Sequence, residues 1–411
     1  MTDFQATYEK VSNLRLFAVT IFLTFISATT HPSPELPSLG DASSKIISPE
    51  LEKRLGREFL KQIHASMKTT DDPLLKYYSE TQIKRLVQYS DFRDEILDIV
   101  VVDSPSLNAF AAPGGVVGVN LGLFLQADDV HEFSSVIAHE LAHLSQRHFA
   151  RRVEERRSGS LTTMASMIAG LLIGAAGGTD AALATISLAQ AASQGNQLRY
   201  SREREIEADR IGLATMVNAG LDPNGASRMF ERMQRAYRFT RRPPEFLLTH
   251  PLSETRIADA KNQARSYPTR EPQKSIAFQM MKVKVEGLYE TNPIVSLQKY
   301  KKLVEKNSSN IAARYGLSLA LVKNSSFEEA VNEFEALRPR LPNTILMLAA
   351  YAEVLASAGQ HQKAEKIVEK RLAISPDNQP LSMIHAKTLI ATKRFKEAEK
   401  ILIRLSKVRP N

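Results

Sequence analysis

The stretch SSVIAHELAHLSQRH, from Ser134 to His148, places two histidines four residues apart, with a glutamate directly after the first. On an α-helix, residues four apart share a face, so His139 and His143 can bind one Zn²⁺ between their imidazoles. Glu140 is turned by about 100° from His139, which keeps it out of the ligand set but within reach of a water on the metal's open position. The motif can also arise by chance, so a zinc site requires a third ligand elsewhere.

Two pairs of acidic residues downstream could supply that ligand. The stretch SREREIEADRIG contains Glu205 with Asp209, and Glu203 with Glu207, each spaced four residues apart but on different faces of one helix. In such a pair, one carboxylate can bind the metal while the other hydrogen-bonds a ligand histidine. The metzincin continuation is excluded, because glutamine and phenylalanine replace its glycine and third histidine. Spacing alone does not choose between the two acidic pairs.

Before this motif, the sequence predicts helices followed by a small sheet. Residues 48–99 carry apolar side chains at helical spacing, with Pro49 near a helix start. The stretch EILDIVVVDSPSLNAFAAPGGVVGVNLGLF then combines a β-rich run at 96–102, a turn at Ser104 and Pro105, and further extended pieces. We expect a hairpin or small sheet, with the motif helix beginning near Val130.

The N-terminal residues resemble an export signal. Basic residues precede a short apolar run at 16–27 that is followed by small residues, which favours a secretory signal peptide over residues 1–30 rather than an uncleaved anchor. The chain of 411 residues has no cysteine, which excludes a disulfide-stapled domain and a lipidated cysteine. We therefore expect a periplasmic protein of a Gram-negative bacterium.

Two further stretches bear on membranes and nucleic acids. Residues 158–196 are poor in charge, and the run from Leu161 to Ala176 is too short to span a bilayer comfortably. A helical hairpin that packs on the catalytic domain or touches the membrane surface is favoured over a transmembrane span. The net charge is +9, but the densest basic group, RHFARRVEERR, is typical of a solvated helix face, so we expect no nucleic-acid partner.

The C-terminal third repeats at a spacing of about 34 residues, which is the period of tetratricopeptide helix pairs. Small, apolar, ring-bearing and proline positions recur in register, and an unrelated helical bundle is the alternative. The recurring positions are Ala330, Ala364 and Ala398; Leu321, Leu355 and Leu389; Phe327, His361 and Phe395; and Pro342, Pro376 and Pro410. We expect a mainly α protein: a zincin-like metallopeptidase domain with a small β-sheet at 46–270, then a tetratricopeptide-repeat α-solenoid at 271–411.

The combination of HELAH with E-x-E-A-D some sixty residues later resembles the zinc peptidases that include the HtpX heat-shock protease and the CAAX prenyl endopeptidase. This resemblance covers about residues 50–411. It implies that Glu205 is the third ligand and Asp209 its partner. The repeats and the export signal narrow the resemblance to the periplasmic β-barrel assembly-enhancing proteases.

The same resemblance assigns further residues. The histidine of LLTHPLSETRIADA, His250, would occupy the fourth position of the metal and hold the enzyme resting; the alternative is a local hydrogen bond. Arg256 would orient an acidic group or stabilise the oxyanion, unless it forms only a structural salt bridge. The stretch NAFAAPGG would lie where a strand pairs with an extended substrate, and its predicted substrate-binding residues are Asn108, Ala109, Phe110, Gly114 and Gly115.

Two functions of different class follow. In the first, the chain is a zinc endopeptidase with one Zn²⁺ per chain, held by His139, His143 and Glu205, in which Glu140 moves a proton from water to the leaving amine. It would degrade misfolded or misassembled outer-membrane proteins and assist their assembly. In the second, it is a chaperone or scaffold that acts mainly through its repeats. The resemblance implies that the repeats dock on the β-barrel assembly machinery or the lipopolysaccharide translocon, with possible peripheral membrane contact.

Overall fold

The structure is a computed structural model that describes residues 47–155, 202–238, 243–268 and 274–408. The predicted signal peptide and the apolar run from Leu161 to Ala176 lie outside the described residues. Within these ranges, no helix is both long and apolar enough to cross a membrane.

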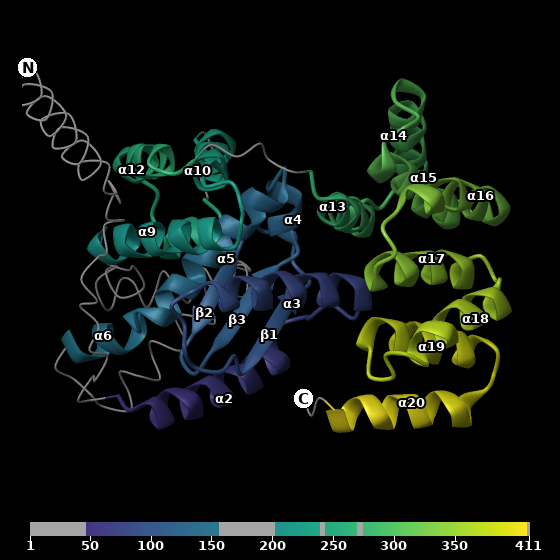
Figure 1. The fold of residues 1–411 in the computed structure, drawn as a ribbon, viewed down its shortest axis with the longest axis horizontal. Coiled ribbons are helices and arrows are strands. Elements are labelled where there is room, and N and C mark those ends of the chain that lie inside the picture. The colour runs from purple at the N-terminus through teal and green to yellow at the C-terminus, as the bar shows by residue number, and fades with distance from the viewer. Residues whose placement is uncertain (1–46, 156–201, 239–242, 269–273, 409–411) are drawn as a thin grey trace, which may run out of the picture. The chain divides into compact units, whose positions relative to one another are not determined.

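The first part of the chain surrounds a small sheet with helices (Figure 1). Its elements are α2 (Pro49–Ser66), α3 (Pro73–Gln88), β1 (Asp98–Val102), β2 (Ala109–Ala112), β3 (Val116–Asn120), α4 (Gly122–Gln126), α5 (Val130–Ser145), α6 (His148–Glu155), α9 (Arg202–Asn218), α10 (Asn224–Tyr237), α11 (Glu245–Thr249) and α12 (Glu254–Arg265). The predicted helices and the predicted start of the motif helix near Val130 are confirmed.

Side-chain caps set where the main helices begin. Ser48 accepts a hydrogen bond from the backbone N–H of Leu51 and precedes a proline at the first helical position of α2. Asp72 caps α3 in the same way, again before a proline. Asp129 caps α5 by accepting from the N–H groups of His131 and Glu132. The motif helix therefore starts at a defined residue, and this start fixes the positions of its histidines along the helix axis.

The sheet has the strand order β1-β3-β2. The predicted small sheet is present, but its antiparallel hairpin joins β2 and β3 and turns at Gly114 and Gly115, both with positive φ, rather than at Ser104 and Pro105. Strand β1 pairs with β3 in parallel, and the sequence did not predict this pairing. Strand β2 therefore forms one edge of the sheet, next to α5.

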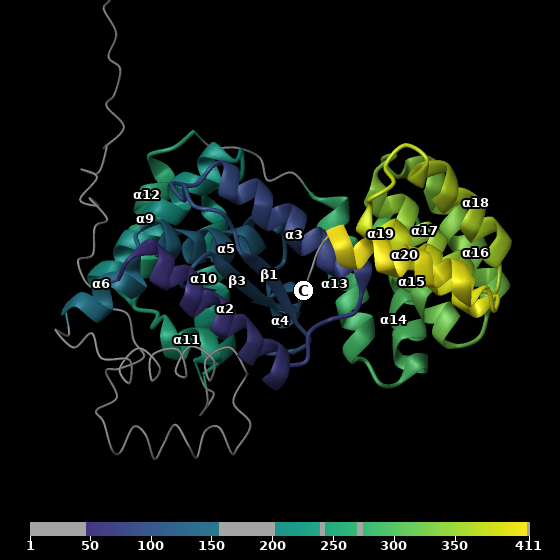
Figure 2. The ribbon, with the colours of Figure 1, turned by 90° about the horizontal axis from the view of Figure 1, so that it is seen from below.

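Helices cover both faces of the sheet. Along β1, Ile99 and Val101 face the core formed with α3 and α5, whereas Val100 and Val102 face Phe59 of α2. Figure 2 shows α2 and α3 on opposite sides of the strands. The motif helix α5 is thus buried between the sheet and further helices, and every residue from Val130 to His143 is buried.

Helix α9 packs along α5 more extensively than any other pair of elements in the described chain. Gly212 allows this approach, because a Cβ at this position would lie 3.0 Å from the backbone of Ala138. The backbones of the two helices are therefore close enough for acidic side chains of α9 to reach the histidines of α5.

The C-terminal part consists of helices α13 to α20 (Figure 1). Their bounds are α13 (Ile276–Tyr289), α14 (Pro293–Lys306), α15 (Ile311–Lys323), α16 (Phe327–Leu337), α17 (Ile345–Ser357), α18 (His361–Leu372), α19 (Gln379–Ala391) and α20 (Phe395–Val408), with a short 3-10 helix η1 at Arg338–Arg340. The recurring alanines are buried on α16, α18 and α20, and the recurring leucines on α15, α17 and α19. The predicted fold class, including the repeats, is confirmed.

Helix α13 joins the repeats to the first part of the chain. Phe278 packs among Tyr78, Phe124 and Phe133, with ring centroids 5.6–6.4 Å away. Lys284 forms ion pairs with Asp72 at the start of α3 (3.0 Å) and with a glutamate of α17. The predicted domain limits, at 46–270 and 271–411, remain predictions, and the boundary between them lies in the undescribed stretch 269–273.

Candidate metal and catalytic site

Helix α5 brings His139, Glu140 and His143 into one buried group. The exposed fraction is 4% for His139, 2% for Glu140 and 3% for His143. The Nε2 atoms of the two histidines lie 3.0 Å apart and face each other, as residues one helical turn apart can. The opening motif therefore forms a two-histidine cluster that is shielded from bulk water.

Glu205 of α9 completes a three-residue cluster. Its Oε2 lies 3.5 Å from Nε2 of His139, and its Oε1 lies 3.5 Å from Nε2 of His143. The competing pair points elsewhere: Glu203 is exposed, and Glu207 contacts His148. The geometry thus agrees with the pairing of Glu205 and Asp209 that the resemblance implies.

His250, the residue that caps the C-terminus of α11, also contacts the cluster. Its Nδ1 lies 3.0 Å from Oε1 of Glu205 and 3.3 Å from Nε2 of His139. Its Nε2 lies 3.3 Å from Oε1 of Glu140, and its ring packs on Phe246 with centroids 4.8 Å apart. His250 therefore contacts both the candidate ligands and the candidate base.

These four residues fit a small tetrahedral metal ion. One ligand atom from each of His139, His143, Glu205 and His250 lies within 4.8 Å of all the others, and all four residues are buried. Metal–ligand distances of about 2.0–2.2 Å place tetrahedral ligand atoms about 3.3–3.6 Å apart. The separations given above between these residues run from 3.0 to 3.5 Å, within or slightly below that range, with Glu205 represented by Oε2 toward His139 and by Oε1 toward His143 and His250. The three imidazoles and one carboxylate of this cluster are also donors that zinc prefers.

Asp209 of α9 and Arg256 of α12 contact the residues of this cluster. Asp209 Oδ1 lies 2.9 Å from Nδ1 of His139, which orients that imidazole with Nε2 toward the cluster. Arg256 donates to both carboxylate oxygens of Asp209 at 2.7 Å, and its Nη1 lies 2.8 Å from Oε2 of Glu205. Arg256 thus contacts the acidic groups, as both an orienting role and a structural salt bridge require, and its predicted role remains a prediction.

Burial and close charges shift the pKa values of the site. Burial lowers the pKa of His139, but hydrogen bonds with Asp209 and Glu205 outweigh this effect and raise it to about 9. Burial and the neighbouring His139 lower the pKa of His143 well below its usual range. Burial raises the pKa of Glu140, as expected for a carboxylate that must accept a proton near neutral pH.

The predicted substrate strand borders this cluster. It includes Ala109 and Phe110 in β2, and the Ala111 N–H of the same strand is hydrogen-bonded to Glu140. The Phe110 ring is buried against Phe59, and Asn108 is 2% exposed. Gly114 and Gly115 form the hairpin turn. These side chains therefore face the protein, so a substrate could use only the backbone of this edge, and their predicted role remains a prediction.

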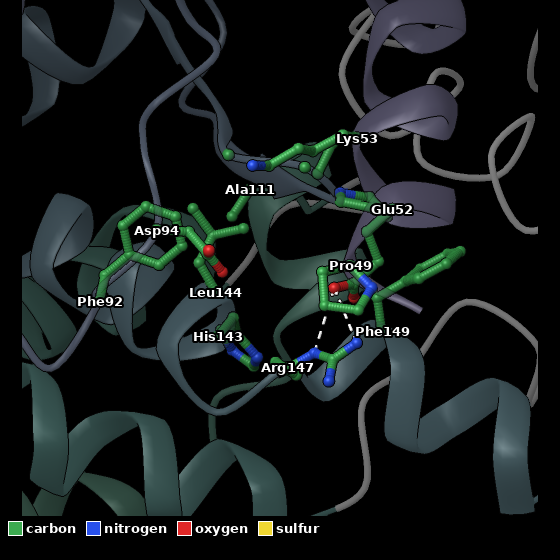
Figure 3. Close-up of a pocket in the computed structure, with 14 residues that line it drawn as sticks. Pro49, Glu52, Lys53, Phe92, Asp94, Ala111, His143, Leu144, Arg147 and Phe149 are labelled. Atoms are coloured by element: carbon green, nitrogen blue, oxygen red, sulfur yellow. Dashed lines mark hydrogen bonds and ion pairs between the residues drawn. The ribbon is translucent and has the colours of Figure 1, made fainter. Parts of the chain in front are cut away.

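A cavity of about 30 Å³ lies next to His143 (Figure 3). Its walls include Ala111 at the end of β2 and Leu144 at the end of α5. Arg147 closes one side, because its Nε donates to Oε2 of Glu52 at 3.1 Å. A cavity of this size holds about one water molecule.

His148 is a buried residue of the site that we did not single out from the sequence. Its Nδ1 lies 2.7 Å from Nδ1 of His143, on the side opposite the cluster. Burial lowers the pKa of His148 to about 4, although Glu207 opposes this shift. The only sequence signal is a third histidine in the opening stretch, and its spacing from the motif gave no reason to assign it a role.

The helix-borne histidines, the buried base beside them and the carboxylate from a neighbouring helix define a metal-dependent peptidase with appended helical repeats. Comparison with known families agrees: residues 73–264 match the model of peptidase family M48, and residues 355–411 match a tetratricopeptide repeat model. The chain belongs to peptidase family M48, and it is a metalloprotease with C-terminal repeats.

Similar proteins cover most of this chain. A Vibrio cholerae protein named "Putative beta-barrel assembly-enhancing protease" is 31% identical over 92% of this chain and 78% of its own length. The beta-barrel assembly-enhancing protease of Escherichia coli K12 is 29% identical over 81% of this chain and 68% of its own. The mitochondrial metalloendopeptidase OMA1 of Schizosaccharomyces pombe is 31% identical over 51% of this chain and 60% of its own.

Proposed function

We propose that this metalloprotease is a zinc endopeptidase whose metal is held by His139, His143 and Glu205, with His250 as a removable fourth ligand. The observation that carries this proposal is the buried cluster of four ligand atoms within 4.8 Å of one another. A bound zinc ion would supply Lewis acidity for the scissile carbonyl and for a water molecule. The resemblance to known members of the family supports the same ligand set.

The residues of the chain divide the remaining work. Glu140 accepts a proton at its carboxylate and returns it to the leaving amine, and its burial favours this exchange by raising its pKa. Asp209 keeps the proton of His139 on Nδ1, so that Nε2 stays available as a ligand. Arg256 balances the charge of Glu205 and Asp209.

His250 acts as a latch in this scheme. It occupies the fourth position of the cluster and contacts Glu140, so both the ligand position and the base are covered. A substrate or partner that moves the end of α11 would free both at once. The contact between His250 and the base supports a resting state that is closed by the chain itself.

For substrates, we propose unfolded or misassembled outer-membrane proteins in the bacterial periplasm. Edge strand β2 supports this choice, because backbone pairing with an extended segment tolerates many sequences. The names of the relatives from Vibrio cholerae and Escherichia coli point to β-barrel assembly. The repeats would then contact the substrate, the β-barrel assembly machinery or the lipopolysaccharide translocon, with possible peripheral membrane contact.

A second function, as a chaperone or scaffold acting through the repeats, is favoured by the extent of the helical array from α13 to α20. A Glu140→Gln variant separates the two functions, because it keeps the shape of the side chain and removes the base. We expect it to keep bound zinc, measured by elemental analysis, and to lose cleavage of an unfolded β-barrel protein. Cleavage at the wild-type rate would refute the mechanism. Glu203→Gln is the matched control, since this glutamate is exposed on α9.

A further inference from the structure

His143 has a polar partner on the side that faces away from the candidate ligands. Its Nε2 faces His139 and Glu205, whereas its Nδ1 lies 2.7 Å from Nδ1 of His148. His148 is fully buried at the start of α6, directly after the motif helix. Two ring nitrogens at this distance share one proton, so one of them must donate and the other must accept.

The far side of His148 decides which nitrogen donates. Its Nε2 lies 3.1 Å from Oε2 of Glu207, and Arg151 contacts both oxygens of the same carboxylate at 3.1 and 3.3 Å. Glu207 therefore accepts, and Nε2 of His148 carries the proton of that imidazole. Because Nε2 of His143 faces the other candidate ligands, it must be free of a proton to bind a metal ion, so His143 donates from Nδ1 and Nδ1 of His148 accepts.

The direction of the hydrogen bond between His143 and His148 determines which form of His143 faces the cluster. With its proton held on Nδ1, His143 presents an unprotonated Nε2 to the cluster, which is the form that binds a metal ion. His139 receives the same support directly from Asp209. Helix α9 thus supplies Glu205 to the cluster itself. Its other two acids act on the histidines: Asp209 orients His139 directly, and Glu207 orients His143 through His148.

We propose that His148 and Glu207 form a positioning relay, in which His148 accepts the Nδ1 proton of His143, Glu207 holds His148 in that tautomer, and both residues thereby strengthen metal binding at His143. The inference rests on the proposed function, because it concerns the affinity of the same site. The proposal assigns a role to Glu207, which the spacing of acidic residues in the sequence had left as an alternative metal ligand.

The test uses the purified full chain and Zn²⁺, with the dissociation constant measured by competition with a chromophoric chelator. His148→Leu removes the acceptor, and we expect it to weaken zinc binding about 10- to 100-fold. His148→Asn places an oxygen where Nδ1 lies and should restore binding to within a few-fold of the wild type. His148→Gln reaches toward Glu207 without offering that acceptor, and should bind as weakly as the leucine variant.

A second measurement separates this role from simple structural support. In the metal-free protein, two-bond ¹H–¹⁵N correlations report the tautomer of His143. We expect the proton on Nδ1 in the wild type and in His148→Asn, and a mixture in His148→Gln. Glu203→Gln, on the exposed face of the same helix, should leave the tautomer and the affinity unchanged.

The outcomes distinguish the relay from the site itself. If the wild type binds one zinc and His148→Leu or His148→Gln binds it equally well, the relay is refuted while the site stands. If His148→Asn is as weak as His148→Gln, the acceptor role is wrong. If the wild type binds no zinc, or if His139→Ala binds it as tightly as the wild type, the proposed metal site fails and the relay with it.

Discussion

Removing the side chain of His250 should raise basal proteolysis. Opening the latch in the wild type breaks the contact between Nε2 of His250 and Glu140 at 3.3 Å and separates the ring from Phe246. One hydrogen bond to a charged group contributes about 1.5–3 kcal/mol, and an aromatic pair about 0.5–1.5 kcal/mol. These figures are already net of water, and because the contact with Glu140 is long we take about 2 kcal/mol as the total in favour of the closed state. That energy keeps the open fraction near one part in about 30.

We therefore expect His250→Ala to increase kcat/KM about 10- to 30-fold. The assay is the initial rate of cleavage of an unfolded β-barrel protein at low substrate concentration, divided by the bound zinc in each preparation. Dividing by zinc matters because the variant also loses a candidate ligand. Leu248→Ala is the matched control, since this exposed side chain belongs to the same short helix. A rate per zinc that is unchanged or lower in His250→Ala would refute the latch.

Three further outcomes follow from burial and charge. Because burial raises the pKa of Glu140, the acidic limb of kcat/KM against pH should lie above the ordinary glutamate value of about 4.3; a limb at or below this value would contradict the assignment. Because the pKa of His139 is about 9 in the metal-free site, zinc must displace a proton from it at neutral pH, so affinity should increase as pH rises toward 9. Calorimetry in buffers of different ionisation enthalpy should detect this proton, and no release at pH 7 would speak against it. Lys284→Met leaves the carboxylates of Asp72 and Glu353 without their buried cation. The free energy of unfolding of this variant, measured in urea, should be about 3 kcal/mol lower than that of the wild type. A loss below about 1 kcal/mol would show that the ion pairs of Lys284 are solvated.

The motif helix and the repeats could be predicted from the sequence because their information is local. His139 and His143 lie one helical turn apart, and the repeat positions recur at a constant interval, so helical geometry alone brings them onto common faces. Extended stretches also indicated a small sheet, but the turn expected at Ser104 and Pro105 does not form its hairpin, which turns at Gly114 and Gly115. The parallel pairing of β1 with β3 was not, because alternation marks a strand without naming its partner or its direction.

The rest of the site depends on contacts between distant parts of the chain. Glu205 and Glu207 belong to overlapping pairs with the same spacing, so spacing does not choose between them; the family resemblance implies Glu205, and the packing of α9 on α5 places Glu205 at the cluster. His148 gave no periodic signal, since its partner lies on another helix. His250 could be found only through the family resemblance, because a single histidine in a loop carries no spacing that predicts a ligand.

The contacts of Arg256 suggest a route by which the proposed latch would open without disturbing the proposed ligands. Its guanidinium forms a bidentate pair with Asp209 and also donates to the backbone oxygen of Pro251, the residue after His250. Breaking the buried pair with Asp209 would cost about 3–5 kcal/mol, whereas the single bond to a carbonyl oxygen contributes about 1.5–3 kcal/mol. Opening should therefore move α11 and His250 while α12 stays on α9. Hydrogen exchange on adding substrate to Glu140→Gln should then increase at residues 245–251 but not at 254–265, and a matched increase in both segments would contradict this route.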